Sequence, residues 1–340
     1  MSRSVQSPSA VVMVRPHHFA SNPETAVDNA FQRRTADDPA VVAGMAMAEF
    51  DVAVATLRGR GITVHVFDDL GTSTPNSVFP NNWFSTHHGG RVAIYPMFAP
   101  NRRRERRADV IDVLKNNYRV QEVIDYSGLE HDRLYLEGTG AMVFDHVERV
   151  AYVGNSNRAN PIILERFCTA FGYEPMAFDT LDEHGRPIYH TNVMMAVGTE
   201  FALVCLQAIA EPTRRAEIAA RLTDSGRTVI DLSYAQVADF AGNAIELAGR
   251  DGLLLALSTR AAAALTPEQR TVIEASATLL PLAIPTIELE GGSVRCMIAG
   301  CTWPPSDAGL TRSPTRATGR TASRTQLRPA PRAPHRRRPG

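Results

Sequence analysis

The residue with the clearest capacity for chemistry is Cys296, which follows a pair of glycines in the stretch IELEGGSVRCMIAG. A thiolate is a strong nucleophile, but a free thiol is only a few per cent ionised near neutral pH, so a base must activate it. His190, in YHTNVMM, and Glu137, in YLEGTGAMVFD, are the candidates for that base and for the carboxylate that orients it. If the fold brings them together, these three residues predict covalent catalysis by a cysteine.

Several of the candidate residues also have a structural interpretation. A single histidine before an apolar strand, such as His190, is usually a structural hydrogen-bonding group. The adjacent Asn81 and Asn82 are typical of a turn, because asparagine tolerates left-handed backbone and bonds to it locally. The run NRRRERR, which contains Arg102, is typical of the solvated start of a helix, although one inward arginine could hold a carboxylate by a bidentate fork.

A repeat along the chain gives the candidate residues a reason to meet. A pair of small or polar residues precedes a short, mostly apolar run at Asn81-Asn82, Thr139-Gly140, Thr191-Asn192, Gly242-Asn243 and Gly292-Ser293. The pairs recur roughly every 50 residues after a longer first interval, and five such units predict a closed ring. The tips of its strands would then carry Asn82, Glu137, His190 and Cys296, with Cys296 on a short apolar strand. The fourth pair offers no acid, base or nucleophile, and we interpret it as structural.

The elements that must position these tips alternate between strands and helices. Short apolar runs predict strands at 11–14, 62–67, 91–98, 149–153, 173–178 and 253–257. Helical patterns cover 39–61, 161–171, 211–221, 234–241 and 266–277. Proline in the first turn marks the start of the helix at 161, and Thr266-Pro267 caps the last helix. The chain is therefore expected to have an α/β fold.

Composition restricts the class of protein. With 340 residues, 44% of them hydrophobic and 21% charged, the chain has material for a large core. The N-terminal sequence lacks the apolar region of a secretory signal and no run of eighteen apolar residues occurs, so we expect a cytoplasmic protein without a membrane partner. The four cysteines show no CxxC pair, which predicts neither a metal site nor a disulfide framework.

Charge is distributed unevenly along the chain. The formal net charge is zero, yet residues 311–340 contain nine arginines and no acidic residue, so the rest of the chain is acidic and nucleic acid is not an expected partner. We expect residues 1–10 to be a disordered leader, 11–300 a catalytic domain and 301–340 a disordered Arg/Pro-rich tail. A frame-shifted C-terminus is our hypothesis for this tail and a nucleic-acid-binding tail its rival; sequencing the locus near codon 300 separates them.

Six motifs resemble, in their order, the pentein superfamily of guanidine-modifying enzymes, which includes arginine deiminase, dimethylarginine dimethylaminohydrolase and the amidinotransferases. They are MVRPHHF with NPETAVDNAFQ, VFPNNWFSTH, LEGTGAMVFD, YHTNVMM, FAGNAIEL and GGSVRCMIA. The resemblance runs from about Val11 to Ala299 and is strongest to the citrulline-utilisation hydrolase branch. It implies a five-bladed α/β propeller, the pentein fold, with pseudo-fivefold repeats.

The resemblance also implies catalytic roles. Cys296 would be the nucleophile and His190 the general acid and base, while Glu137 would orient the histidine or hold a substrate nitrogen. Arg102 and Arg158 look like the arginines that hold the carboxylate of an amino-acid substrate. No cofactor is implied.

The motif around residues 75–82 departs from that of the dimethylarginine hydrolases. Those enzymes show P-D-x-V-F-x-E-D, and here all three acids are asparagines, Asn76, Asn81 and Asn82. A guanidinium is charged at any physiological pH, and leaving a buried charge without its partner costs about 3–5 kcal/mol. A neutral ureido group instead needs hydrogen bonds that asparagine both donates and accepts. We therefore expect the chain to hydrolyse citrulline to ornithine, carbon dioxide and ammonia.

Two alternatives stay open at this point. One is a guanidine hydrolase, of the arginine deiminase or dimethylarginine dimethylaminohydrolase type, or an amidinotransferase on the same scaffold; Glu137 by itself could pair a cationic substrate. The other is an inactive amino-acid-binding pentein. The oligomeric state is also open, a homo-oligomer included.

Overall fold

The computed structural model describes residues 5–33 and 35–303, and their strands form five three-stranded sheets. Each sheet pairs an inner strand antiparallel with a middle strand, and the chain then crosses through a helix to an outer strand that runs parallel to the middle one. Inner strands of neighbouring sheets contact one another, β15 with β3, β6 with β9 and β9 with β12. Five units were expected from the repeat, and five sheets are present in the part of the chain that the structure describes.

The strands have the following bounds, given in the order inner, middle, outer. They are β15 (Ala299–Cys301), β1 (Ala10–Pro16) and β2 (Thr63–Asp69); β3 (Phe84–His87), β4 (Arg91–Ile94) and β5 (Glu122–Asp125); β6 (Met142–Asp145), β7 (Val150–Gly154) and β8 (Glu174–Phe178); β9 (Met195–Val197), β10 (Phe201–Val204) and β11 (Thr228–Asp231); β12 (Ile245–Gly249), β13 (Gly252–Ser258) and β14 (Ala277–Leu282). The first sheet joins the two ends of the described chain, because β1 pairs with β15.

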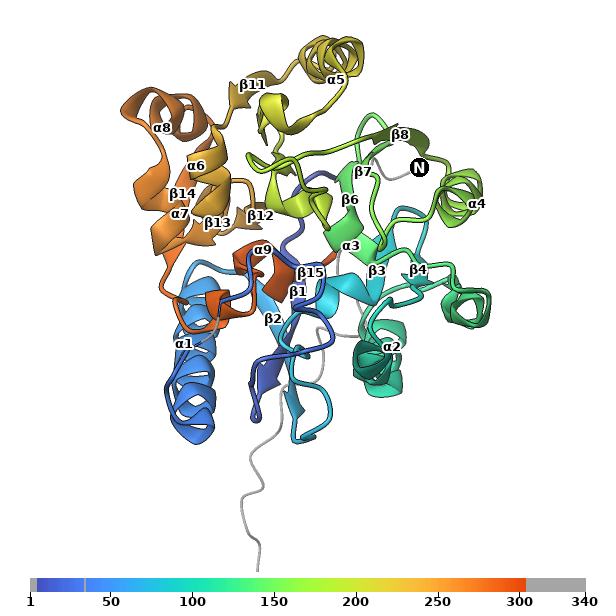
Figure 1. Ribbon diagram of the computed structural model, residues 1–340, viewed down its shortest axis with the longest axis vertical. Helices are drawn as coiled ribbons and strands as arrows, with labels where there is room; N and C mark the ends of the chain where they lie inside the picture. Colours follow the sequence, from blue (N-terminus) through green and yellow to red (C-terminus); the bar gives the residue numbers. More distant parts are fainter. Residues whose placement is uncertain (1–4, 34, 304–340) are drawn as a thin grey trace, which may run out of the picture.

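The longer helices lie at the periphery of the molecule, and two one-turn helices lie near its middle (Figure 1). The helices are α1 (Pro39–Gly59), α2 (Ala108–Asn117), α3 (Gly138–Ala141), α4 (Pro161–Phe171), α5 (Pro212–Asp224), α6 (Tyr234–Ala238), α7 (Thr259–Ala264), α8 (Pro267–Glu274) and α9 (Val294–Met297). Their starts follow the sequence signals: Asn160 caps α4 through its side chain, and Thr266 and Gln269 form a capping box on α8.

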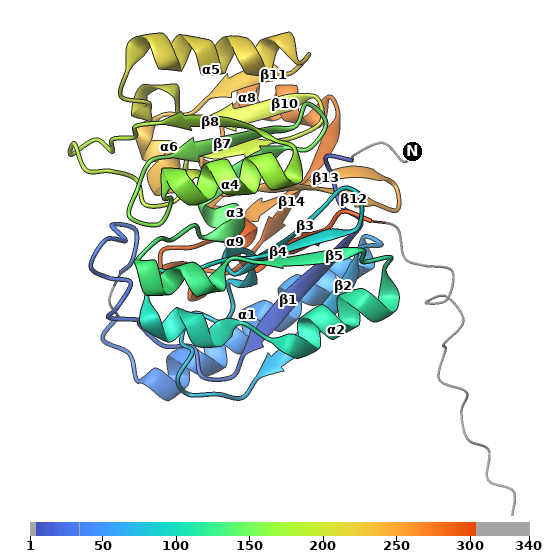
Figure 2. The ribbon, with the colours of Figure 1, turned by 90° about the vertical axis from the view of Figure 1, so that its right-hand side faces the viewer.

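The core lies between the sheets and these helices. Figure 2 shows β1 passing between α1 and α2, and its alternating residues pack accordingly, Val11 in the cluster of α1 and Val12 in that of α2. Helix α1 is long and apolar enough to cross a membrane by length and composition, with a mean hydropathy of 1.7. Phe50 and Leu57, both fully buried, pack α1 on the core cluster of the first sheet, and core helices of folded domains pass the same length test.

Two boundaries expected from the sequence are wrong. Gln6, in the segment expected to be a disordered leader, donates hydrogen bonds to the carbonyls of Phe144 and Val197 and so joins the inner strands β6 and β9. The expected tail starts inside β15, where Cys301 pairs with Ala10 of β1, and both are buried. A polar segment can be ordered by main-chain carbonyls that lie far away in sequence, which composition does not reveal. The frame-shift hypothesis concerns residues that lie outside the described part from 304 onward.

Candidate active site

A small cavity lies beside the N-terminal ends of the inner strands, where the repeat places its polar pairs. Six of the eight predicted site residues line it, namely Asn76, Asn82, Arg102, Arg158, His190 and Cys296. Thr25 and Asn29, from the segment between β1 and α1, close it on one side. Its volume is about 20 Å³, whereas one water needs about 10–15 Å³ on this measure. The cavity as the structure has it is therefore too small for an amino acid, and binding of one requires the cavity to widen.

Cys296 lies in the one-turn helix α9, and the expectation that it lies on a strand is wrong. Gly291, with a φ of 74°, turns the chain, and the amide of Cys296 then donates to the carbonyl of Ser293 to close the helical turn. The side chain is buried, and its Sγ accepts hydrogen bonds from Asn192 Nδ2 at 3.4 Å and Asn243 Nδ2 at 3.3 Å. Two side-chain amides therefore donate to one sulfur, from two different units of the repeat.

His190 and Glu137 form a buried pair. His190 Nε2 lies 2.9 Å from Glu137 Oε2, and Oε1 of the same carboxylate accepts from the main-chain amide of Phe98 at 2.9 Å. Arg158 Nη1 lies 3.4 Å from Oε2, and Arg102 Nη1 lies 4.0 Å from it. Burial opposes ionisation of Glu137, but the charge of Arg158 and the hydrogen bond from His190 outweigh it and lower the pKa of Glu137.

Burial also lowers the pKa of His190, against the opposing effect of Glu137, so the resting imidazole is neutral. Because the carboxylate of Glu137 accepts a hydrogen bond from Nε2 of His190, the proton of the neutral ring lies on Nε2. The other nitrogen, Nδ1, is then free to take up a proton. Gly140 permits this placement of the ring, since a Cβ at Gly140 would lie 2.7 Å from His190 Nδ1 and would overlap the side-chain amide of Asn82.

The two predicted arginines are buried and already paired. Arg102 donates from Nε and Nη2 to Glu105 at 3.0 and 2.8 Å. Arg158 pairs with Asp28 and lies over the ring of Tyr189, 4.8 Å from its centroid. Asp28 comes from the same segment as Thr25 and Asn29, so this ion pair ties that segment to the site.

The three predicted asparagines take different positions. With its amide oxygen toward Arg102, Asn82 accepts from Nη1 at 2.8 Å and donates to Asn81 at 3.0 Å. Asn76 Nδ2 donates to Glu290 Oε2 at 3.0 Å at the cavity wall. Asn81 is fully buried behind the cavity rather than on its wall, so the structure does not bring it to the substrate site.

Sequence reasoning missed three residues of the site. Asn192 and Asn243 are the second members of two repeat pairs, and their spacing was a signal that both reach the common centre. Asn243, in the pair that we interpreted as structural, contacts the sulfur of Cys296. Glu290 lines the cavity and accepts from the main-chain amide of Asn22 and from Asn76. Burial raises the pKa of Glu290, which favours its neutral form. No spacing in the sequence singled it out.

A family model described as N,N dimethylarginine dimethylhydrolase, eukaryotic, matches residues 15–303. The chain belongs to this pentein family. The pentein superfamily comprises guanidino-modifying enzymes, and the resemblance seen in the motifs is thereby confirmed. No curated protein sequence gives a significant match.

Solved structures of other penteins share the fold. ArgZ, an arginine dihydrolase of cyanobacteria, is 16% identical with a TM-score of 0.68, over 88% of this chain and 41% of ArgZ. This pentein therefore spans about two fifths of the length of ArgZ. The N-terminal domain of ArgZ, in a cysteine-to-serine variant bound to substrate, is 16% identical with a TM-score of 0.65, over 87% of this chain and 98% of that domain. An adduct of dimethylarginine dimethylaminohydrolase is 13% identical with a TM-score of 0.58, over 86% of this chain and 100% of that one. At these identities the likeness shows an α/β fold with small sheets.

Proposed function

We propose that this pentein is a cysteine-dependent hydrolase that cleaves the C–N bonds of the ureido group of citrulline. The observation that carries the proposal is the state of Glu137, whose two oxygens already accept from His190, Arg158 and the amide of Phe98. A carboxylate has about four acceptor positions, and three of those of Glu137 are taken, all by groups of the protein. Glu137 also lies behind the cavity wall, so it is a poor partner for a guanidinium substrate.

The groups that remain around the cavity suit a neutral substrate head. Asn76 and Asn82 line it with amides, and the raised pKa of Glu290 reduces the negative charge that a cation would need. Arg102 and Arg158 also line the cavity, but each is paired with a carboxylate, Glu105 or Asp28, so either arginine binds the carboxylate of an amino acid only by giving up part of that pair. These features favour citrulline over arginine, because amides can bind a neutral ureido group but leave a buried guanidinium without a counter-charge.

The proposed reaction begins with attack of the Cys296 thiolate on the ureido carbon. The carbon becomes tetrahedral and its oxygen takes up negative charge, which hydrogen-bond donors around the site stabilise by about 3 kcal/mol each. The proton that the thiol of Cys296 loses passes to Nδ1 of His190. The resulting imidazolium gives this proton to the departing nitrogen, and the C–N bond breaks to leave a thioester on Cys296. Water, deprotonated by His190, then cleaves the thioester. The released carbamate loses carbon dioxide, so one citrulline and one water give ornithine, carbon dioxide and ammonia.

A second candidate is hydrolysis of arginine or of methylated arginine. The names of the family model and of ArgZ favour it, because both refer to guanidino substrates. Glu290 would then be the carboxylate that pairs the guanidinium, since it is the acidic residue on the cavity wall among the described residues. The two candidates differ in the charge of the substrate head and hence in the ionisation that they require of Glu290.

We also propose that the five sheets are the blades of an α/β propeller with pseudo-fivefold symmetry. The common order of strands in each sheet, the contacts between neighbouring inner strands and the closure of the first sheet by β1 and β15 support this arrangement. In such a ring the inner strands surround a single axis, and the polar pairs that precede them meet at one end of it.

A panel of citrulline, arginine and dimethylarginine tests the proposed function. The purified protein is incubated with each substrate, and ornithine and ammonia are quantified over time, with Cys296→Ala as the inactive control. We expect ornithine from citrulline and no product in the variant. Turnover of arginine or dimethylarginine with citrulline left intact would assign the second candidate. Citrulline binding without turnover of any substrate in the parent protein would indicate a binding protein instead.

A further inference from the structure

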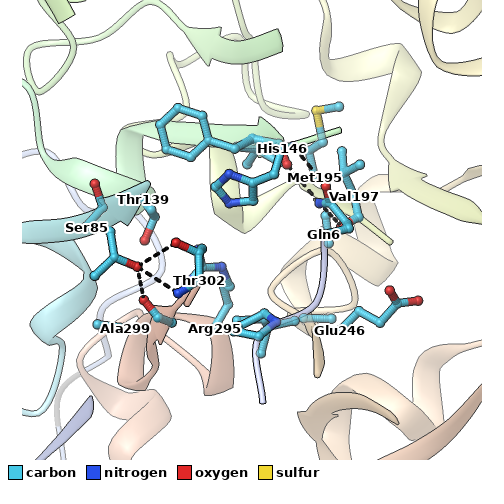
Figure 3. Close-up of a pocket in the computed structure, with 18 of the residues that line it drawn as sticks. Gln6, Ser85, Thr139, His146, Met195, Val197, Glu246, Arg295, Ala299 and Thr302 are labelled. Carbon is cyan, nitrogen blue, oxygen red and sulfur yellow. Dashed lines mark hydrogen bonds between the residues drawn. The ribbon is translucent and has the colours of Figure 1, made fainter. Parts of the chain in front are cut away.

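A second cavity lies on the other side of α9 from the catalytic one, and all five inner strands contribute to its wall. Arg295 lines this cavity, whereas its neighbour Cys296 lines the catalytic cavity. The one-turn helix α9 thus presents a cation to one cavity and a nucleophile to the other. Figure 3 shows Arg295 and His146 on facing walls of the second cavity.

Arg295 is half-buried, and its guanidinium has no counter-charge in the part of the chain that the structure describes. Among the described residues, no carboxylate lies within ion-pair distance of it, and its side chain donates a single hydrogen bond, from Nη1 to the carbonyl of Ile298 at 2.8 Å. Glu246 also lines the cavity, but its Oε2 is held by Ser7 and Thr199, and its carboxylate points away from Arg295 (Figure 3). Arginine stays charged in proteins, and several donors of its planar fork are left over.

The wall opposite Arg295 provides a further donor. His146 Nδ1 lies 2.8 Å from the hydroxyl of Tyr173, while Nε2 has no partner among the described residues. The same hydroxyl lies 3.1 Å from His87 Nδ1, and its one proton is assigned to the shorter contact with His146, so that His87 donates to it. The proton of the neutral His146 imidazole then lies on Nε2 and is available for a hydrogen bond into the cavity. The pKa of His146 is lowered to about 3 by burial and by the charges of Arg149 and Arg295, which keeps this neutral form at physiological pH.

Size restricts what the cavity can hold. Its volume is about 60 Å³, where one water needs about 10–15 Å³ on the same measure. This is room for a few waters or for one small anion, and too little for an amino acid. Planar oxyanions match the bidentate geometry of a guanidinium better than a spherical ion does.

We propose that Arg295 and His146 form a binding site for a small planar oxyanion, of the bicarbonate, nitrate or formate class, behind the catalytic cysteine. Arg295 holds two oxygens through its fork, and His146 donates to the third from the facing wall. The bound anion neutralises the cation that adjoins Cys296, so it weakens the support for negative charge on the sulfur. By reciprocity, a negative charge on the sulfur weakens anion binding. The site would therefore make the reactivity of the nucleophile sensitive to small anions.

The test measures thermal unfolding of the full chain against sodium nitrate, with sodium gluconate as the replacement salt at constant ionic strength. Gluconate is too large for the cavity and serves as the size control. We expect the unfolding midpoint to rise with nitrate and to saturate, by about 2 °C at ten times the dissociation constant. The rise should vanish in Arg295→Met and persist in the matched control Arg166→Met, which replaces an exposed arginine on α4.

Other outcomes overturn the proposal. The cavity holds no oxyanion if the unfolding midpoint of the parent protein does not rise and saturate with nitrate. It also holds none if the midpoint rises equally in Arg295→Met, which is the result that binding at Arg102 and Arg158 would give.

A second measurement on the parent protein covers the case that Arg295→Met does not fold. Nitrate, but not gluconate, should slow alkylation of Cys296 by iodoacetamide by about twofold or more, because the cation beside it is neutralised. An alkylation rate that is the same in both salts at equal ionic strength contradicts the coupling between the two sides of α9 and overturns the proposal in that case.

Discussion

The amide of Asn192 offers the cleanest test of how the site activates its nucleophile. Its Nδ2 donates to Cys296 Sγ at 3.4 Å, while its Oδ1 is buried without a partner. Replacing it by alanine removes one of two donors to the sulfur and leaves the other, from Asn243. The main-chain carbonyl of Asn192, which accepts from Asn243, remains in place. The change therefore affects the sulfur more directly than it affects the fold.

The size of the effect follows from these contacts. A hydrogen bond to a charged group contributes about 1.5–3 kcal/mol, so loss of one donor should slow attack by Cys296 about 10- to 100-fold. Stability should change little, by about 1 kcal/mol, because the unpaired Oδ1 of Asn192 is removed with the donor and this offsets part of the cost of the small void. A strong loss of reactivity with a small loss of stability is the expected result for Asn192→Ala.

The assay compares the rate of alkylation of Cys296 by iodoacetamide, read by mass spectrometry at neutral pH, with kcat/KM for the substrate that the panel identifies. The matched control is Asn155→Ala, which removes an exposed amide that bonds to Asp179 and not to the sulfur. Thermal unfolding of each variant separates misfolding from loss of activation. If folded Asn192→Ala keeps both rates within about twofold of the parent, the two amides do not support the thiolate, and the reasoning on α9 and its surroundings fails.

Three further changes test other parts of the site. Glu137→Gln should lower kcat by about 10³- to 10⁴-fold, because His190 loses the carboxylate that fixes its tautomer; an unchanged kcat in a folded variant contradicts the assigned pair. Gly140→Ala should lower kcat about 100-fold with a smaller effect on stability, since its Cβ would displace the imidazole and the amide of Asn82; steady-state kinetics and thermal unfolding check both. Between pH 6.5 and pH 3 the free energy of unfolding should fall as the pH falls, by up to about 1.4 kcal/mol per pH unit from His146 alone. In this range His146 takes up a proton in the unfolded chain but not in the folded one. Denaturant unfolding of His146→Gln should show a shallower dependence on pH.

The repeat in the sequence was the basis for predicting both the five-unit fold and the residues that meet at the site. The pairs that end at Gly140, Asn192, Asn243 and Ser293 occur at nearly constant spacing, and a constant spacing in sequence becomes an equivalent position in each sheet. This is why His190 and Cys296, far apart along the chain, line one cavity. The structure shows where His190 and Cys296 lie, and their catalytic roles stay predictions.

Local sequence could not predict the rest, because long-range contacts decided it. The run around Cys296 is apolar enough for a strand, yet the turn at Gly291 and the contact of Asn243 with the amide of Arg295 select one turn of helix. Gln6 lies in a polar segment whose composition indicates disorder, and the carbonyls of two distant inner strands order it. Neither partner is visible in the sequence near these residues.

The change from strand to helix at α9 has a chemical consequence. On a strand, Arg295 and Cys296 would point to opposite faces and be held by the ladder of one sheet alone. In the single turn observed, the amide of Arg295 is fixed by Asn243 Oδ1 and the sulfur of Cys296 by Asn243 Nδ2, so one side chain sets the positions of both residues. If an anion bound in the second cavity shifts Arg295, we expect Asn243 to move with the Arg295 amide and its hydrogen bond to the sulfur to change. Asn243, which we interpreted from the sequence as structural, is thus the residue through which we expect the two cavities to be coupled.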